Sequence, residues 1–174
     1  MKNQIALTLK EASKIIPNKS KIFTHCYSTS VITLLIAAKE EGKKFEVFTT
    51  EVRPKYLGRK AALKLAENKI KVSITTDLAG PALLQNCDLL LFGAEEIKKD
   101  GSIINKVGTN TLLKTAKEFK IPAYCVFKEG KRNKKRINTK DQLWKTAPKG
   151  ITVLNPGHEE VYSSNSYTLL GLKA

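Results

Sequence analysis

The sequence predicts an α/β fold in which a doubly wound, mainly parallel sheet forms a single Rossmann-like domain. Short apolar runs alternate along the chain with longer amphipathic segments, which is the order of strands and helices in sheets of this kind. The apolar runs are continuous, as expected for strands of a parallel sheet that is buried on both faces. The length of 174 residues suits one domain with a substantial core and is short for two.

The alternation can be followed element by element. Continuous apolar runs predict strands at 21–26, 45–51, 71–76, 88–93 and 122–127. The segments between them carry periodic apolar residues and predict helices at 30–44, 59–69, 80–86 and 109–120. Gly42 ends the first of these helices, and Pro81 lies at the start of the third, where its fixed φ favours helix initiation. One face of the last helix is apolar, with Leu112, Leu113, Ala116 and Phe119.

The two ends of the chain depart from this alternation. Residues 1–20 are expected to form a short N-terminal helical segment, and residues 21–174 the Rossmann-like domain. Within that domain, 128–140 holds seven basic residues and one acid, and we expect a basic surface loop there. The stretch 150–157 is the candidate for a last strand, which would give a sheet of about six strands.

The composition indicates a charged protein of a reducing compartment. The formal net charge of +15 favours polyanions or phosphorylated ligands, although Lys and Arg are scattered through every predicted helix, as on an ordinary solvated surface. Cys26, Cys87 and Cys125 form no C-x-x-C pair, which argues against a disulfide framework or a cysteine-rich zinc site. The longest apolar run is too short to span a bilayer, and nucleotide-binding glycine motifs are absent. We therefore expect a cytoplasmic protein with no metal, no cofactor and no membrane association.

Polar residues follow the predicted strands at the ends where ligands bind in open α/β sheets. Cys26 ends the first strand, and Glu95 follows the fourth. The other candidates lie after the second and third strands or lead into the last helix, and they are Arg53, Asp77, Asn105, Lys106, Gly108 and Thr109. Gly108 permits close approach of the backbone to a ligand, and the helix after it offers free N–H groups to a phosphate. Lys106 adds a positive charge for the same anion.

Each of these residues also has a structural explanation. Cys26 can be a small buried hydrophobe, Asp77 can cap the helix that follows it, and Thr109 is a good N-cap for any helix. His25 alternates with Cys26 in the first strand, so we expect it to point to the opposite face and to be structural. What favours a binding or catalytic site is the convergence of the candidates on one edge of the sheet.

Four segments of the chain form a set of motifs in fixed order: THCYSTSV, TEVRPKYLGRKAALKLA, DLLLFGAEEIKKDGSIINKVGT and IPAYCVF. Together they resemble the C-terminal domain of the initiation-factor-2B-related family over roughly residues 21–127, with a weaker echo at Asn155-Pro156. That family contains the α, β and δ regulatory subunits of the guanine nucleotide exchange complex of a translation factor. It also contains isomerases that act on methylthioribose 1-phosphate and ribose 1,5-bisphosphate.

The resemblance implies roles for individual residues. In the isomerases a Cys in THC and an Asp in GAD serve proton transfers on the sugar, which makes Cys26 and Glu95 the implied catalytic pair. Further positions of the family's motifs are held by Arg53, Asp77, Asn105 and Lys106. Glu95 is one methylene longer than the usual Asp, and Leu57 replaces a Gln that contacts the sugar phosphate. The family's phosphate-binding arginines come from an N-terminal helical domain, and about twenty residues before the first strand are too few for it.

Three functions are compatible with these residues. The one favoured by Glu95 and Leu57 is an initiation-factor-2B-like regulatory or sensing domain that binds a sugar phosphate or nucleotide. The alternative, favoured by Cys26, Arg53, Asn105 and Lys106, is an aldose–ketose isomerase acting on a ribose 1-phosphate-type substrate. The sequence therefore leaves open whether the chain is an enzyme. A bare interaction domain that kept the fold and lost the pocket ranks third. The resemblance also implies a homodimer or larger homo-oligomer, with the translation machinery as a partner.

Overall fold

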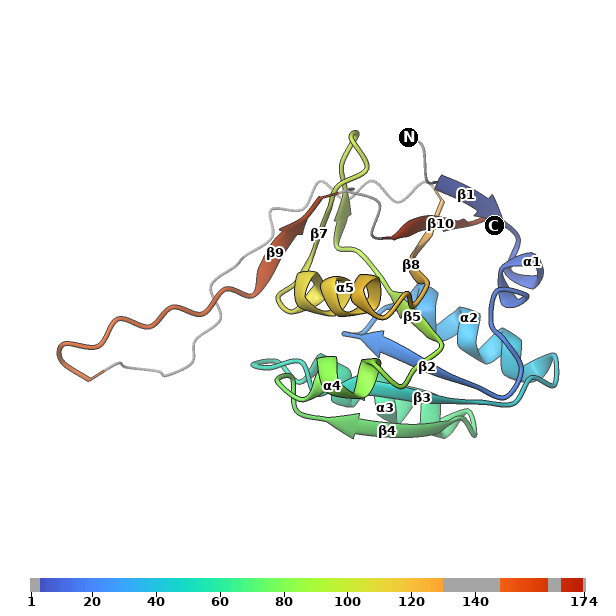
Figure 1. The fold of residues 1–174 in the computed structure, drawn as a ribbon, viewed down its shortest axis with the longest axis horizontal. Helices are drawn as coiled ribbons and strands as arrows, with labels where there is room; N and C mark the ends of the chain where they lie inside the picture. The colour runs from blue at the N-terminus through green and yellow to red at the C-terminus, as the bar shows by residue number, and fades with distance from the viewer. Residues whose placement is uncertain (1–3, 130–147, 163–166, 174) are drawn as a thin grey trace.

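The main structural feature is a seven-stranded sheet in which every neighbouring pair of strands runs parallel (Figure 1). The computed structural model describes residues 4–129, 148–162 and 167–173. The strand order is β1-β10-β8-β5-β2-β3-β4. The bounds are β1 (Gln4–Leu7), β2 (Ser20–His25), β3 (Phe45–Thr50), β4 (Lys71–Thr75), β5 (Leu89–Phe92), β8 (Ala123–Lys128) and β10 (Thr168–Leu172). The predicted α/β class with a mainly parallel sheet is confirmed.

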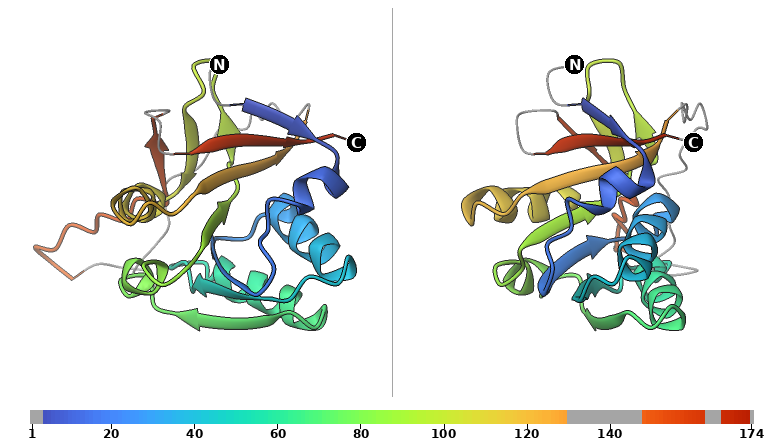
Figure 2. Two further views of the ribbon diagram at one scale, coloured as in Figure 1. Left: turned by 45° about the vertical axis from the view of Figure 1, so that its right-hand side comes forward. Right: turned by 90° about the vertical axis from the view of Figure 1, so that its right-hand side faces the viewer.

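Helices cover both faces of this sheet (Figure 2). On one face lie α1 (Leu9–Ser13), α2 (Thr29–Glu40) and α3 (Leu57–Glu67). On the other face lie α4 (Gly80–Leu84) and α5 (Thr109–Glu118). The sheet is therefore the middle layer of three, as in doubly wound folds.

Strand β5 shows why the predicted strands are continuously apolar. Leu89 and Leu91 pack into the core beside α1, α2 and α3, whereas Leu90 and Phe92 pack into the core beside α4 and α5. None of the four is more than 1% exposed. Burying one such side chain stabilises a fold by about 1.5–3 kcal/mol, so a polar residue at any position of β5 would be costly.

A second, antiparallel sheet lies beside the carboxyl end of β5. It consists of β6 (Glu96–Ile97), β7 (Ile103–Lys106) and β9 (His158–Val161) in the order β6-β7-β9. Strand β9 pairs with β7 so that Glu159 lies opposite Asn105 and His158 lies opposite Lys106. Residues from the C-terminal part of the chain thus reach the segment that leads into α5.

The five strands and four helices predicted from local patterns are all present, but the two chain ends differ from expectation. The stretch 150–157 is not a strand: it has an isolated bridge at Pro156 and extends away from the sheets (Figure 1). The last strand of the main sheet is β10, inserted between β1 and β8. Residues 1–20 are not only helical, because β1 precedes α1 and forms an edge of the sheet. The expected basic loop at 128–140 lies, from residue 130 onward, outside the described residues.

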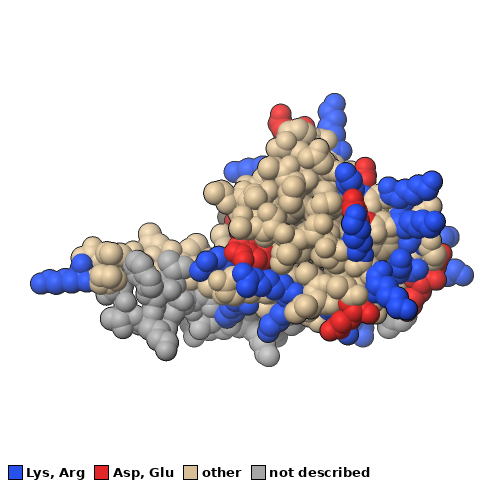
Figure 3. Space-filling model, turned by 90° about the horizontal axis from the view of Figure 1, so that it is seen from below, with Lys and Arg blue, Asp and Glu red and all other residues tan. Residues whose placement is uncertain are grey.

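Charge is dispersed on the face of the molecule at the β4 edge of the sheet (Figure 3). Seen from the β4 edge of the sheet, basic side chains are spread over the face with acidic ones among them, and they form no single stripe (Figure 3). This distribution fits a solvated surface better than a track for a polyanion. Across the described ranges, none of the helices has the length and apolar character needed to cross a membrane.

Candidate functional site

A small cavity lies at the carboxyl ends of β2 and β5, where ligands bind in open α/β sheets. Its volume is about 170 Å³. The lining residues come from the end of β2, the start of α2, the loop after β5 and strand β7, and they are His25, Cys26, Tyr27, Ser28, Thr29, Gly93, Ala94, Glu95 and Asn105. Three of the residues expected to share a cleft, Cys26, Glu95 and Asn105, are therefore brought together.

The backbone at Cys26 explains why its neighbour also borders the cavity. Cys26 has φ of 68°, in the left-handed region that L-residues rarely adopt. This turn ends the regular alternation of β2, and both His25 and Cys26 border the cavity. The His25 ring contacts Thr50 and Val107, and the expectation that it points to the face opposite Cys26 stays a prediction. A residue held in this region costs about 1–3 kcal/mol, and such residues cluster at functional sites.

The Cys26 thiol is held in its protonated form near neutral pH. Burial raises the pKa of Cys26 to about 11; the positive charge of Lys106 opposes this shift and the negative charge of Glu95 adds to it. A protonated thiol is a proton donor and a weak nucleophile. The side chain therefore suits acid–base chemistry better than covalent attack.

Gly93 allows β5 and α2 to meet at the cavity. A Cβ atom at Gly93 would collide with the side chain of Ser28, the N-cap of α2. Glu95, two residues further on, donates its backbone N–H to Ile104 of β7 at 2.9 Å. The carboxylate-bearing loop is thus fixed between the start of α2 and the small sheet.

Asn105 is positioned by Thr109. Asn105 is 4% exposed, and its Nδ2 donates to Thr109 Oγ1 at 3.1 Å. The Thr109 hydroxyl donates in turn to the Lys106 carbonyl at 2.7 Å. Thr109 is the first residue of α5, and the N-cap is Gly108, with φ of 102°. The hydroxyl of Thr109 is used inside the protein, where it orients a residue of the cavity.

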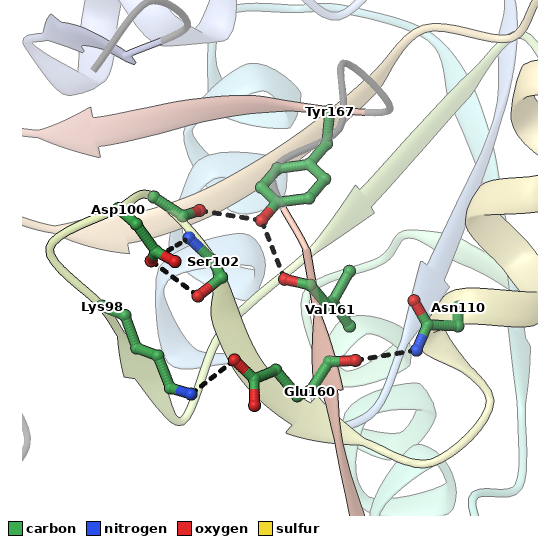
Figure 4. A network of polar contacts seen from close by, with 8 residues as sticks. Lys98, Asp100, Ser102, Asn110, Glu160, Val161 and Tyr167 are labelled. Carbon is green, nitrogen blue, oxygen red and sulfur yellow. Dashed lines mark hydrogen bonds and ion pairs between the residues drawn. The ribbon is translucent and has the colours of Figure 1, made fainter.

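The N-terminus of α5 is occupied by a carboxylate of the same chain. Glu159 of β9 accepts hydrogen bonds from the backbone N–H and the Nδ2 of Asn110, at 2.8 and 3.0 Å. The neighbouring Glu160 accepts from Asn110 through its carbonyl and pairs through its carboxylate with Lys98 (Figure 4). One of the N–H groups expected to be free after Gly108, that of Asn110, is therefore bound by Glu159, a carboxylate at the helix N-terminus.

Lys106 lies beside this contact and also meets β9. Its side chain is 8% exposed, and Nζ lies 2.7 Å from Nε2 of His158. Since an ammonium group can only donate, Nε2 of His158 is the acceptor. His158 and Glu159 were not predicted from the sequence, and the one indication near them was the weaker family similarity at Asn155-Pro156.

Arg53 and Asp77 lie together and are not among the residues that line the cavity. Asp77 accepts hydrogen bonds from the backbone N–H groups of Val52 and Arg53, each at 2.8 Å. Val52 has φ of 56°, which is costly for a β-branched residue. The guanidinium of Arg53 lies 5.4 Å from the ring centre of Tyr56. Asp77 therefore stabilises the strained turn after β3, and the structure does not join Arg53 and Asp77 to the lining of the cavity.

Comparison with known proteins places these observations in a family. The profile of the Initiation factor 2 subunit family (IF-2B) matches residues 2–160. The chain is 32% identical over 162 residues to a ribose 1,5-bisphosphate isomerase of Thermococcus kodakarensis, covering 84% of this chain and 50% of that protein. It is 34% identical over 131 residues to a putative translation initiation factor eIF-2B subunit 2-like protein of Pyrococcus furiosus, covering 75% and 48%.

The fold is shared with solved structures. The translation initiation factor eIF-2B of Pyrococcus horikoshii superposes with a TM-score of 0.79 at 24% identity, over 93% of this chain and 59% of that one. The chain spans about half the length of the curated relatives described above. The match of the family profile over nearly the whole sequence shows that the chain belongs to the Initiation factor 2 subunit family.

Proposed function

We propose that the cavity binds a pentose phosphate and that the domain carries the proton-transfer groups of an aldose–ketose isomerase acting on a ribose 1-phosphate-type sugar. The observation that carries this proposal is that Cys26 and Glu95 line the same cavity of about 170 Å³. The sequence favoured a sensing role with isomerisation as the alternative; the shared cavity favours the alternative. Relatives with this activity support it at the level of the family.

The chemistry requires a proton donor and a proton acceptor. In a ribose 1-phosphate the oxygen on C1 carries the phosphate, so the bond between C1 and the ring oxygen breaks and the ring oxygen takes up a proton. One hydrogen moves from C2 to C1, and the C2 hydroxyl loses its proton as it becomes the ketone carbonyl, with no net change in composition. A protonated Cys26 can supply a proton, and the Glu95 carboxylate can accept one. The two side chains thus provide both halves of the exchange.

The size of the cavity favours a sugar over a nucleotide. Pockets for drug-sized ligands measure roughly 300–1,000 Å³, whereas this one measures about 170 Å³. A pentose fits such a space with its phosphate at the mouth. A base, ribose and phosphates together would leave most of the ligand outside.

The anchor for the phosphate is the start of α2. Ser28 and Thr29, the N-cap and first residue of this twelve-residue helix, line the cavity, and unpaired N–H groups of a first turn bind anions. The charge of Lys106 acts on Cys26 and hence on the same space. This assignment replaces the start of α5, where Glu159 already accepts from Asn110.

The test is turnover of ribose 1,5-bisphosphate, followed by NMR detection of the ketose, with binding measured separately by calorimetry. We expect weak turnover, because Arg53 does not line the cavity and Leu57 is apolar, and we expect Cys26→Ala and Glu95→Gln to abolish it. Cys87→Ala is the matched control, since Cys87 is a buried thiol whose pKa is also raised to about 11 by burial. Turnover by Cys26→Ala at the rate of the natural chain would refute the proposal. Failure of the natural chain to bind ribose 1,5-bisphosphate would also refute it.

A sensing domain is the second candidate. It is favoured because groups that could bind a phosphate are bound by other residues of the chain. The main example is the start of α5, where Asn110 donates to Glu159. Binding without turnover in the same experiment would support it. Turnover that rises in the double variant Leu57→Gln/Glu95→Asp would instead identify a weakened isomerase. Self-association and contact with the translation machinery belong to the same proposal, and sedimentation of the chain tests the first of them.

A further inference from the structure

His25 connects three elements that meet at the cavity. It is the last residue of β2 and is 3% exposed. Its Nδ1 lies 3.3 Å from Oγ1 of Thr50, the last residue of β3, and its Nε2 lies 3.2 Å from the carbonyl oxygen of Val107. Val107 stands in the turn between β7 and α5. One imidazole ring therefore bridges the ends of two strands of the main sheet and the turn that follows Lys106.

The hydrogen bonds define the tautomer of this ring. The Val107 carbonyl can only accept, so Nε2 carries the proton and Nδ1 accepts from the Thr50 hydroxyl. Burial lowers the pKa of His25, against the opposing effect of the charges of Asp77 and Glu159. The ring is neutral at physiological pH, and both of its nitrogens have a defined partner.

The turn packs closely against the imidazole. A Cβ atom built on Gly108 would lie 3.5 Å from Cε1 and 3.6 Å from Nε2 of His25. The φ of 102° at Gly108 belongs to a region that favours glycine. The hydrogen bond from Nε2 to Val107 thus holds the turn beside the ring, and a side chain at position 108 would meet the imidazole.

We propose that His25 is a positioning residue: its Nε2–H bond to Val107 fixes the turn after β7, and with it the strand end that carries Asn105 and Lys106, relative to the Cys26 thiol. The inference deepens the proposed function and rests on it, because it concerns the same cavity. Asn105 lines that cavity together with Cys26, and Lys106 acts on Cys26 through its charge. The bond from the ring to the turn therefore sets the electrostatic surroundings of the thiol.

Two amide variants separate the two hydrogen bonds of His25. In His25→Gln the side-chain amide reaches the position of Nε2 and can still donate to Val107. In His25→Asn the amide reaches only the position of Nδ1 and can still contact Thr50. Thr50→Val, nearly isosteric, removes the Thr50 bond in the natural background and leaves the Val107 bond. If a His25 variant does not fold, Thr50→Val still tests which bond matters.

The first measurement is hydrogen exchange of the backbone, read by mass spectrometry on the folded full chain without ligand. One net hydrogen bond contributes about 0.5–1.5 kcal/mol, so the amides of 107–110 should exchange up to roughly tenfold faster in His25→Asn. They should exchange as in the natural chain in His25→Gln and Thr50→Val. Exchange that is faster by the same factor in His25→Gln and His25→Asn would show a general structural role and overturn the proposal. Faster exchange spread evenly over β2 and β3 would do the same.

The second measurement is the pH profile of Cys26 alkylation, with Cys87 as an internal reference because burial raises the pKa of that thiol to about 11 as well. We expect the apparent pKa of Cys26 to rise in His25→Asn, since the charge of Lys106 no longer acts from a fixed position, and to stay unchanged in His25→Gln. An unchanged profile in His25→Asn would overturn the proposal. Neither measurement uses a sugar phosphate, so failure here is distinguishable from failure of the proposed function.

Discussion

Asp77 holds two successive backbone N–H groups, and the loss of this contact can be worked out from its geometry. The bonds to Val52 and Arg53 are each 2.8 Å long and are assisted by the charge of the carboxylate. Bonds to charged groups contribute about 1.5–3 kcal/mol each. Water can replace the partner at Arg53, whose bond is exposed, but not fully at Val52, which is 4% exposed. Asp77→Ala should therefore lower the free energy of unfolding by about 2–4 kcal/mol.

Urea denaturation followed by circular dichroism measures this change, and the melting temperature should fall by roughly 5–15 °C. Asp77→Asn keeps one acceptor oxygen, so its free energy of unfolding should fall by about half as much as that of Asp77→Ala. Asp88→Ala is the matched control, because Asp88 accepts one exposed backbone bond, from Lys21 at 2.8 Å. A loss in Asp77→Ala no larger than in Asp88→Ala would refute the reasoning.

Three further predictions follow from contacts described by the structure. Glu159→Ala should destabilise the protein by about 1–3 kcal/mol in urea titrations, because a helix N-terminus loses its carboxylate, whereas Glu160→Ala breaks only a part-exposed ion pair and should cost at most about 1 kcal/mol. Gly58→Ala should lower the melting temperature although alanine favours helices, since its Cβ would collide with the last carbonyl of β3; in Gly42→Ala nothing lies within 4 Å and only the φ of 85° is unfavourable. Burial lowers the pKa of His25 below its ordinary 6.5, so the unfolded chain takes up a proton at a higher pH than the folded chain. The free energy of unfolding should therefore be highest above pH 6.5 and fall on acidification, and it should depend less on pH in His25→Gln.

The order of the central elements was predictable because a buried parallel strand leaves a simple signal. Every residue of β5 is buried, so its sequence is continuously apolar. Strand β10 is also apolar and buried, with Leu169, Leu170 and Leu172, but it was not predicted, and the four residues of β1 form no clear period. The position of β10 between β1 and β8 depends on tertiary structure and cannot be predicted from local sequence patterns.

The same distinction applies to the site. Cys26, Glu95 and Asn105 could be predicted as a group, because the carboxyl ends of parallel strands meet at one edge. Arg53 follows β3 in the same way but does not line the cavity, and its backbone N–H is bound by Asp77 in the turn at Val52. Glu159 reaches the start of α5 from about fifty residues further along the chain. Contacts between residues so far apart in the chain depend on how β9 pairs with β7, and local sequence patterns do not predict that register.

The parallel pairing of β1 with β10 has a consequence for biosynthesis. Of the described elements, β1 leaves the ribosome first and β10 last, and the register joins Gln4 to Leu169 and Leu7 to Leu172. The pairs that β10 forms with β1 and β8 cannot assemble until β10 has been translated, whereas β2, β3, β4, β5 and β8 can pair earlier. Non-local pairings of this kind slow folding and leave strand edges exposed. The nascent chain therefore presents the open edge of β8 during synthesis, and a chaperone that covers strand edges would find its substrate there.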